Sequence, residues 1–161
     1  MTYRIEEDDL YRRRDSLRLR RFDYSSQRVY FVTIVVADRR QLFLEQRLAR
    51  AVLARLLELR SQLGFKLYCY CLMPDHFHAL IGVGGSGRSL GEICGAFKSL
   101  TTRDYWQWRD GRLWQRQFYD HIIRNEADFL ETLEYIAMNP VRKGLVRTPD
   151  EWPYTGKVDV L

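Results

Sequence analysis

The chain has few cysteines and histidines, with three of each among its 161 residues. It also has no long apolar run. An odd number of cysteines, with no apolar leader in the charged N-terminal segment, argues against a disulfide framework and for a reducing compartment. No window approaches the length of a membrane span. We therefore expect a soluble, cytoplasmic protein with no membrane partner.

The chain does have enough apolar residues for a core, and it carries an excess of positive charge. Hydrophobic residues make up 46% and aromatic residues 14% of the sequence, which suits one globular domain of this length. The net charge is +5, and arginine, whose planar guanidinium binds phosphate oxygens, supplies most of the excess. Such an excess is typical of a solvated basic surface and also of a nucleic-acid-binding protein. Charge alone leaves both open.

The pattern along the chain predicts one domain after a charged arm. Residues 1–24 lack an apolar face, so we interpret them as a basic, flexible N-terminal arm and residues 25–161 as a single domain. β-Branched and aromatic runs predict strands at 28–36, 65–73, 76–83 and 113–123. Apolar residues at steps of three and four predict helices at 45–64, 90–108 and 125–140. The last helix should end near Pro140, because the residue before a proline avoids the helical region, and an irregular tail should follow.

This order of elements predicts an α+β fold. The sequence runs strand, helix, strand, strand, helix, strand and then one further helix. We expect a ferredoxin-like β-α-β-β-α-β sandwich, an antiparallel sheet with two helices on one face. The other face is then free for chemistry, and the additional C-terminal helix can pack near it.

Two of the three histidines stand one residue apart in the predicted strand "HFHALIGV". Side chains two positions apart in a strand point to the same side. His76 and His78 therefore share one face, while Phe77, Ala79 and Ile81 point to the helix-covered core. The histidine pair should lie on the open face of the sheet. Two neutral imidazoles at this spacing can bind one divalent ion; the alternative is two partly exposed histidines bonded to their neighbours.

The sequence leaves the choice of metal open. Cys69 and Cys71 lie in the neighbouring predicted strand and could complete a cysteine–histidine zinc site, although two small core cysteines need no metal. Mg²⁺ or Mn²⁺ would instead require oxygen ligands in addition to the imidazoles. Asn139, in the last predicted helix, is a candidate for such a ligand.

The last predicted helix also carries a candidate nucleophile. Its apolar stripe consists of Phe129, Leu133 and Ile136, with Leu130 and Ala137 beside it. Tyr135 lies off this stripe, and Asn139 follows four residues later on the same side. A tyrosine hydroxyl beside a metal-bound phosphodiester can attack the phosphorus and conserve the bond energy in a covalent phosphotyrosine. The alternative is an ordinary amphipathic tyrosine.

The motifs "PDHFHALI" and "LEYIAMNPVRKGLV" together resemble those of the REP-associated tyrosine transposases, which are single-tyrosine HUH endonucleases. The resemblance implies that Tyr135 is the nucleophile and that His76, His78 and Asn139 bind Mg²⁺ or Mn²⁺. It also implies a ferredoxin-like single-stranded DNA endonuclease and strand transferase. Such an enzyme cleaves next to hairpin-forming palindromic repeats and leaves a 5′-phosphotyrosine and a free 3′-hydroxyl.

Three other functions remain open at this point. One is a non-catalytic DNA hairpin-binding protein or autoregulator, which we would recognise by loss of a histidine or of the tyrosine; none is lost here. Another is a zinc-stabilised nucleic-acid-binding domain with Cys69 and Cys71 as ligands. The last is a metal hydrolase without a covalent step, whose activity would survive removal of Tyr135.

Basic and aromatic residues offer contacts to single-stranded or hairpin DNA, bound by a monomer or a homodimer. In residues 104–119, "DYWQWRDGRLWQRQFY", aromatic rings alternate with arginines, a pattern that suits stacking of unpaired bases, although we expect Trp114 and Phe118 to be core residues. The predicted DNA contacts are Arg28, Arg39, Arg40, Lys98, Arg103, Trp106, Arg112, Arg116, Arg124, Arg142 and Lys143.

Overall fold

The computed structural model describes residues 28–160, so the predicted arm at residues 1–24 lies outside the described residues. The main elements are β1 (Val29–Val35), α2 (Gln46–Leu63), β2 (Lys66–Leu72), β3 (His76–Gly82), α3 (Leu90–Tyr105), β4 (Tyr119–Ile122), α4 (Glu126–Arg142) and β5 (Thr155–Lys157). Short 3₁₀ helices are η1 (Ala37–Arg39), η2 (Leu42–Leu44) and η3 (Pro149–Glu151). Every strand and helix that the sequence predicts is present.

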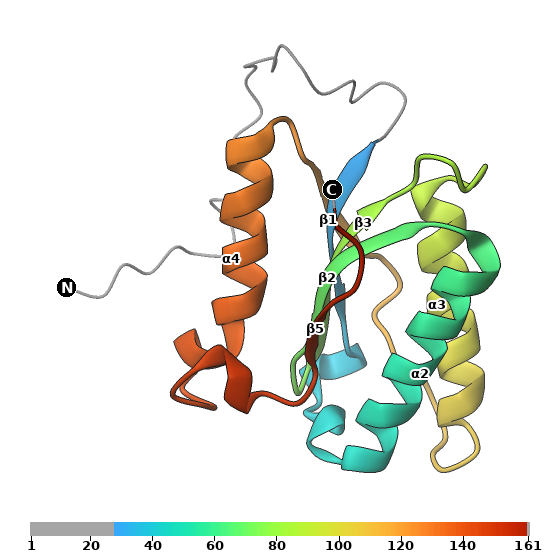
Figure 1. Ribbon diagram of the computed structural model, residues 1–161. Coiled ribbons are helices and arrows are strands. Elements are labelled where there is room, and N and C mark those ends of the chain that lie inside the picture. The colour runs from blue at the N-terminus through green and yellow to red at the C-terminus, as the bar shows by residue number, and fades with distance from the viewer. Residues whose placement is uncertain (1–27, 161) are drawn as a thin grey trace.

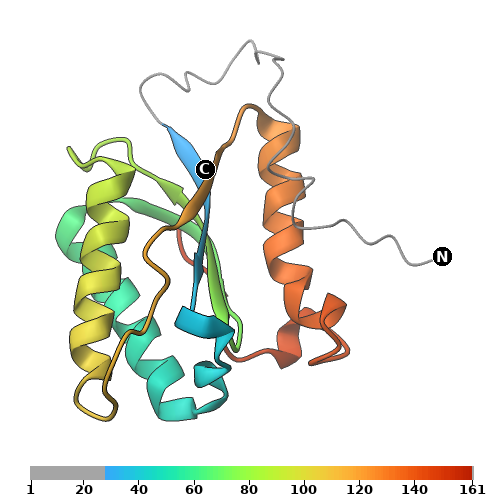
Figure 2. The same ribbon diagram turned by 180° about the vertical axis from the view of Figure 1, so that it is seen from behind.

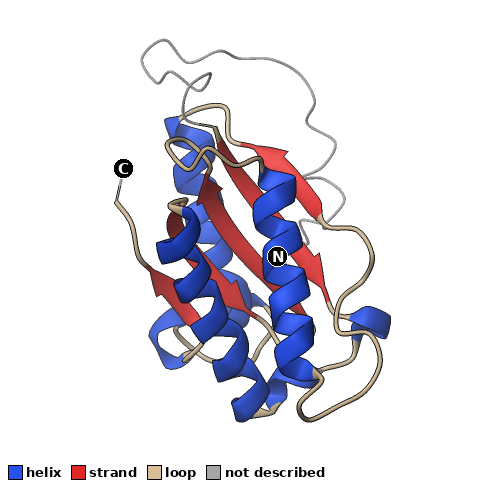
Figure 3. Cartoon of the chain, turned by 90° about the vertical axis from the view of Figure 1, so that its right-hand side faces the viewer, coloured by secondary structure: helices blue, strands red, loops and turns tan. Residues whose placement is uncertain are grey.

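The strands form one antiparallel sheet in the order β4-β1-β3-β2-β5. Helices α2 and α3 cover one face of this sheet, and α4 lies against the other (Figure 1). Figure 3 looks onto the face that α2 and α3 cover. The order β4-β1-β3-β2 with two helices on one face is the ferredoxin-like arrangement, so the predicted fold class is confirmed. It places β1 and β3 in the middle of the sheet.

A first core lies between the sheet and helices α2 and α3. Phe77, Ala79 and Ile81 of β3 point into it, as the alternation along this strand predicts. The leucines and the valine that recur along α2 pack against them, and Gly64 ends the helix in the left-handed conformation, with φ of 74°. None of the helices within residues 28–160 has the length and apolar character needed to cross a membrane.

A second, smaller core lies between α4 and the opposite face of the sheet. Phe31 of β1 and Leu80 of β3 belong to it, together with Phe129 and Ile136 of α4. Every residue of β1 is buried, because this strand packs against helices on both of its faces. The face that the sequence leaves free for chemistry is thus covered by the additional helix.

β4 is shorter than predicted. Of the predicted strand 113–123, only Tyr119–Ile122 pairs continuously with β1, and a single isolated bridge forms at Trp114. Trp114 is buried in the first core, where its Nε1 donates a hydrogen bond to Thr101 Oγ1. After it, the carbonyls of Gln115 and Arg116 accept hydrogen bonds from the side chain of Lys98, and here the ladder is interrupted. Phe118 is partly buried against the same core, as expected. Figure 2 shows this segment running along the edge of the sheet toward α4.

The C-terminal part differs from the prediction at two points. α4 continues through Pro140 to Arg142. A proline removes only one backbone donor, and the amide of Lys143 still donates to the carbonyl of Asn139, which carries the turn onward. The tail, predicted to be irregular, contains β5, which pairs with the outer edge of β2. An unpaired sheet edge offers backbone donors and acceptors to any nearby chain.

Asp159 fixes the chain just beyond β5. Its carboxylate accepts hydrogen bonds from the guanidinium of Arg60 in α2 and from the backbone N–H of Leu67 in β2. The bond from Arg60 lowers the pKa of Asp159 to about 2. The segment that returns from α4 is therefore tied to the sheet and to α2, and this limits where α4 can lie.

We expect Asp159→Asn to destabilise the fold at pH 7 by about 1–2 kcal/mol, because a lowered pKa in the folded state stabilises it. The stabilisation is present in full at pH values above 3.8, the ordinary pKa of an aspartate, and is lost as the pH falls toward 2. Urea unfolding should therefore separate the variant from the unaltered protein at pH 7 and less so at pH 3. The exposed Asp150→Asn serves as a control and should match the unaltered protein. A difference that does not change with pH would contradict the assignment.

Candidate metal and nucleophile site

His76 and His78 lie on the face of β3 that α4 covers. Both imidazoles point away from the first core, and the His78 ring lies 5.2 Å from that of Phe31, measured between centroids. The two imidazole centroids are 4.5 Å apart. The exposed fractions are 4% for His76 and 3% for His78. The predicted face is correct, but the expectation of an open surface is wrong, because α4 packs directly over the pair.

Each histidine has one ring nitrogen in a hydrogen bond within the fold. Nδ1 of His76 lies 2.6 Å from Oδ1 of Asp75, and Nδ1 of His78 lies 2.9 Å from Oγ1 of Thr33. A proton on Nδ1 that is donated to such an oxygen leaves the lone pair of the ring on Nε2. These two bonds orient both rings so that their Nε2 atoms face the space under α4.

Asn139 of α4 completes a set of three buried atoms that lack a partner. Among residues 28–160, the buried side-chain nitrogen and oxygen atoms without a hydrogen bond are Nε2 of His76, Nε2 of His78 and Oδ1 of Asn139. Burying such atoms unpaired is costly, so they rarely occur together without a ligand. Two imidazole nitrogens and one amide oxygen are a donor set that fits a divalent metal ion. These are the three residues that the sequence nominates as metal ligands.

The charges around the pair keep His78 in the form that binds metals. Burial, together with the positive charges of Arg142 and Lys143, holds the pKa of His78 well below its usual value, so its imidazole is neutral at pH 7. The hydrogen bond to His76 lowers the pKa of Asp75, and the nearby charge of Arg39 acts in the same direction. Asp75 therefore stays ionised and can accept a hydrogen bond from the protonated Nδ1 of His76.

The cysteines show no sign of a zinc site. Cys69 and Cys71 are buried in the second core, and burial raises the pKa of Cys69 to about 12 and that of Cys71 to about 11. Both are thus neutral thiols packed as small apolar side chains. Within the described part of the chain, no group of three or more histidine, cysteine or acidic residues is arranged to hold a metal. A metal site at the histidine pair therefore needs the amide oxygen of Asn139 as its third ligand.

Tyr135 lies beside the histidines. It projects from α4, half-buried, and its ring centroid is 5.9 Å from that of His78 and 5.8 Å from that of Phe31. The guanidinium carbon of Arg142 lies 4.0 Å from the ring centroid on its other side. The candidate nucleophile and the candidate metal ligands therefore meet at one place, between α4 and β3.

α4 presents a more polar side to the sheet than its apolar stripe predicts. Thr132 and Asn139 are buried along with Phe129 and Ile136, whereas Leu130 is 52% exposed. The helix is rotated toward its polar side because the surface that it meets carries the histidine pair. Predicting the buried side of a helix from hydrophobicity alone fails when the opposing surface is itself polar.

Three of the predicted DNA contacts surround the histidine pair. Arg142 and Lys143 act on the charge state of His78, and Arg39 on that of Asp75. Within residues 28–160 none of these three cations forms an ion pair with a carboxylate, unlike Arg55 and Arg60 elsewhere. The site is thus bordered by positive charge that no carboxylate of residues 28–160 neutralises through an ion pair.

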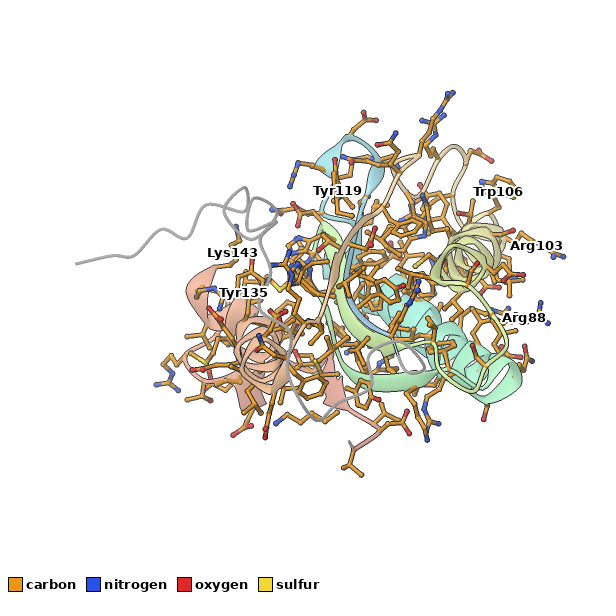
Figure 4. The ribbon with its side chains drawn as sticks, turned by 90° about the horizontal axis from the view of Figure 1, so that it is seen from above. Arg88, Arg103, Trp106, Tyr119, Tyr135 and Lys143 are labelled. Atoms are coloured by element: carbon orange, nitrogen blue, oxygen red, sulfur yellow. The ribbon has the colours of Figure 1, made fainter. Side chains whose placement is uncertain are left out.

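The other predicted DNA contacts are spread over the molecule. Arg40 and Lys98 donate to backbone carbonyls of the 112–116 segment and so hold that segment in place. Arg103 and Trp106, the latter 57% exposed, belong to the side of α3, across the sheet from Tyr135 and Lys143 (Figure 4). The remaining four are Arg28, Arg112 and Arg116, which are exposed, and Arg124, which is half-buried.

Sequence reasoning missed the residues that orient the site. Thr33 is signalled by its place as a polar residue in the middle of an apolar strand, and Asp75 by its place directly before His76. The third histidine, His121, pairs with Asp128 at a distance of 3.0 Å between Nε2 and Oδ2. This pair joins β4 to the first turn of α4. It helps to fix the position of the helix that carries Tyr135.

Comparison with known proteins places the chain in one family. The family described as Transposase IS200 like matches residues 25–139, which include both histidines, Tyr135 and Asn139. The chain belongs to the IS200-like transposase family. The resemblance stated from the sequence is thereby confirmed.

Particular relatives are REP-associated transposases. A protein of Haemophilus influenzae, provisionally named a REP-associated tyrosine transposase, is 28% identical over 84% of this chain and 82% of its own length. The REP-associated tyrosine transposase of Escherichia coli is 25% identical over 78% of this chain and 74% of its own. A solved REP-associated tyrosine transposase bound to a REP hairpin has the same fold. Its TM-score is 0.73 at 22% identity, over 87% of this chain and 82% of that one.

We expect Thr33→Val to weaken Mn²⁺ binding by about tenfold, because His78 loses the partner that orients its ring while the side-chain volume stays nearly the same. Isothermal titration calorimetry with Mn²⁺ measures this affinity. Thr101→Val removes a buried threonine hydroxyl that is bonded to Trp114 of the first core, across the sheet from the histidines, and provides the matched control. Equal losses in both variants would mean that the Thr33 effect is a general cost of the substitution.

Proposed function

We propose that this chain is a metal-dependent single-stranded DNA endonuclease and strand transferase, which cleaves next to hairpin-forming palindromic repeats through a 5′-phosphotyrosine. The observation that carries the proposal is the meeting of three unpartnered buried ligand atoms with the ring of a tyrosine. A binding protein has no need of either feature. Membership of the IS200-like transposase family supports the same reaction class.

His76, His78 and Asn139 would hold Mg²⁺ or Mn²⁺ through two Nε2 atoms and one Oδ1 atom. When bound, such an ion withdraws charge from a phosphate oxygen and helps to orient the phosphodiester. Asp75 and Thr33 keep the imidazoles in the tautomer that leaves Nε2 unprotonated. α4 excludes bulk water from the pair, which strengthens electrostatic interactions at the site.

Tyr135 supplies the nucleophile in this proposal. Its hydroxyl oxygen attacks the phosphorus, a Tyr–O–P bond forms, and the bond from phosphorus to the 3′-oxygen breaks. The phenol proton is balanced by the proton that the departing 3′-oxygen gains. Because the phosphotyrosine conserves the energy of the broken bond, a 3′-hydroxyl can attack it in turn, so that the strand is transferred instead of hydrolysed.

The surrounding charge suits a nucleic-acid substrate. Arg39, Arg142 and Lys143 border the site, form no ion pair with a carboxylate of the described residues, and can receive the phosphates next to the cleaved bond. A related transposase has been solved with a REP hairpin bound, which supports hairpin DNA as the partner of this chain. One copy of the chain brings all four proposed site residues together, which supports a site built within one chain, whether that chain acts as a monomer or in a homodimer.

We expect Tyr135→Phe to abolish the covalent protein–DNA adduct and to leave hairpin affinity within about threefold, because it removes one hydroxyl and no charged phosphate contact. The adduct is measured on a denaturing gel with Mn²⁺ and a labelled oligonucleotide that carries a palindromic repeat and its single-stranded flank. His76→Ala should also abolish the adduct, through loss of a metal ligand.

Other outcomes of this experiment identify other functions. An adduct that persists in Tyr135→Phe would mean that a different residue is the nucleophile. Cleavage without any adduct in the unaltered protein would indicate a metal hydrolase. A hairpin that is bound but never cut, with either Mg²⁺ or Mn²⁺, would indicate a non-catalytic hairpin-binding protein.

A further inference from the structure

Arg142 makes two contacts with a single residue, Tyr135. Its guanidinium carbon lies 4.0 Å from the centroid of the tyrosine ring. Its Nη2 also donates a hydrogen bond of 2.7 Å to the backbone carbonyl oxygen of Tyr135. The two residues are seven positions apart, just under two turns of a helix, and therefore lie on the same side of α4. One side chain thus holds both the ring and the backbone of the same residue.

The hydrogen bond from Arg142 to Tyr135 crosses the part of α4 that contains Pro140. A proline inside a helix removes one backbone hydrogen bond and presses against the carbonyl of the preceding turn, so the helix is weakened there. In α4 this weak point lies between Tyr135 and Arg142, directly after Asn139. The bond from Arg142 to the carbonyl of Tyr135 spans the weak point. It joins the last turn of α4 to the turn that carries the tyrosine.

The charge of Arg142 forms no ion pair within the part of the chain that the structure describes. Among the described residues no carboxylate pairs with its guanidinium, whereas Arg147, five residues further on, pairs with Glu151. A guanidinium above an aromatic ring is attracted by the negative face of the ring, and its planar shape stacks in a way that the ammonium of lysine cannot reproduce. The contact with Tyr135 is therefore specific to arginine.

We propose that Arg142 is a positioning residue for the nucleophile. Stacking on the ring and bonding to the Tyr135 carbonyl together keep the phenol ring beside the imidazole of His78 before DNA arrives. Arg142 takes no proton and forms no bond in the reaction; it acts through Tyr135. The inference rests on the proposed function for its effect on cleavage, but the contact itself can be tested without DNA.

The kinetic test compares Arg142→Lys with Arg147→Lys, the same chemical change at a residue whose side chain is 92% exposed. Adduct formation is measured at saturating hairpin oligonucleotide with Mn²⁺, and hairpin affinity is measured separately. Arg142→Lys keeps the charge, so we expect affinity to stay within about threefold, while the rate falls by about tenfold to a hundredfold because the nucleophile is misplaced. Arg147→Lys should match the unaltered protein in both. A normal rate for Arg142→Lys, or rate and affinity falling together, would overturn the proposal.

The structural test uses protein labelled with 3-fluorotyrosine. The ¹⁹F signal of Tyr135 is the one that Tyr135→Phe removes. We expect Arg142→Lys to shift and broaden this signal while the other tyrosine signals keep their positions, and Arg147→Lys to change nothing. An unchanged Tyr135 signal in Arg142→Lys would overturn the proposal. If the unaltered protein forms no adduct, the proposed function fails, and this spectrum still decides whether Arg142 holds the ring.

Discussion

The packing of α4 on β3 is the contact on which the rest of the candidate site depends. The helix brings Tyr135 and Asn139 to the histidine pair, and its apolar residues Phe129 and Ile136 hold it against the sheet. Burial under this helix is also the first cause of the lowered pKa of His78. Without α4 the imidazoles would be ordinary exposed side chains. Without the imidazoles, Asn139 and Tyr135 on α4 would have no polar group of β3 beside them.

The packing of α4 on β3 carries a cost in folding free energy. A buried polar atom without a partner destabilises a fold by about 1–3 kcal/mol, and three such atoms lie under α4. The helix is nevertheless fixed at both ends. Asp128 pairs with His121 in its first turn. After its last turn the chain returns to the sheet, where the indole of Trp152 donates to the carbonyl of Leu72. A locally unfavourable site held by its surroundings is typical of functional sites.

Most of the fold could be predicted from the sequence because its elements have strong local patterns. The alternation along β3 indicates which face Phe77 and the two histidines occupy, and the spacing of leucines indicates the buried side of α2. The errors lie where distant contacts outweigh local preference. The β4 ladder is interrupted where Lys98 bonds to the backbone of residues 115–116, Pro140 is accepted within α4, and β5 forms because the edge of β2 is available.

For the site, the sequence by itself determined the chemical groups: two imidazoles on one side of a strand, and a tyrosine and an amide on one side of a helix. Strand and helix periodicity are local properties, so a sequence suffices for them. Only the tertiary structure decided that these two surfaces face each other and are buried together. It also brought Thr33 of β1 to His78 of β3, two residues that are 45 positions apart in the sequence. These contacts depend on how β1, β3 and α4 pack, and packing brings together residues that lie far apart in the sequence.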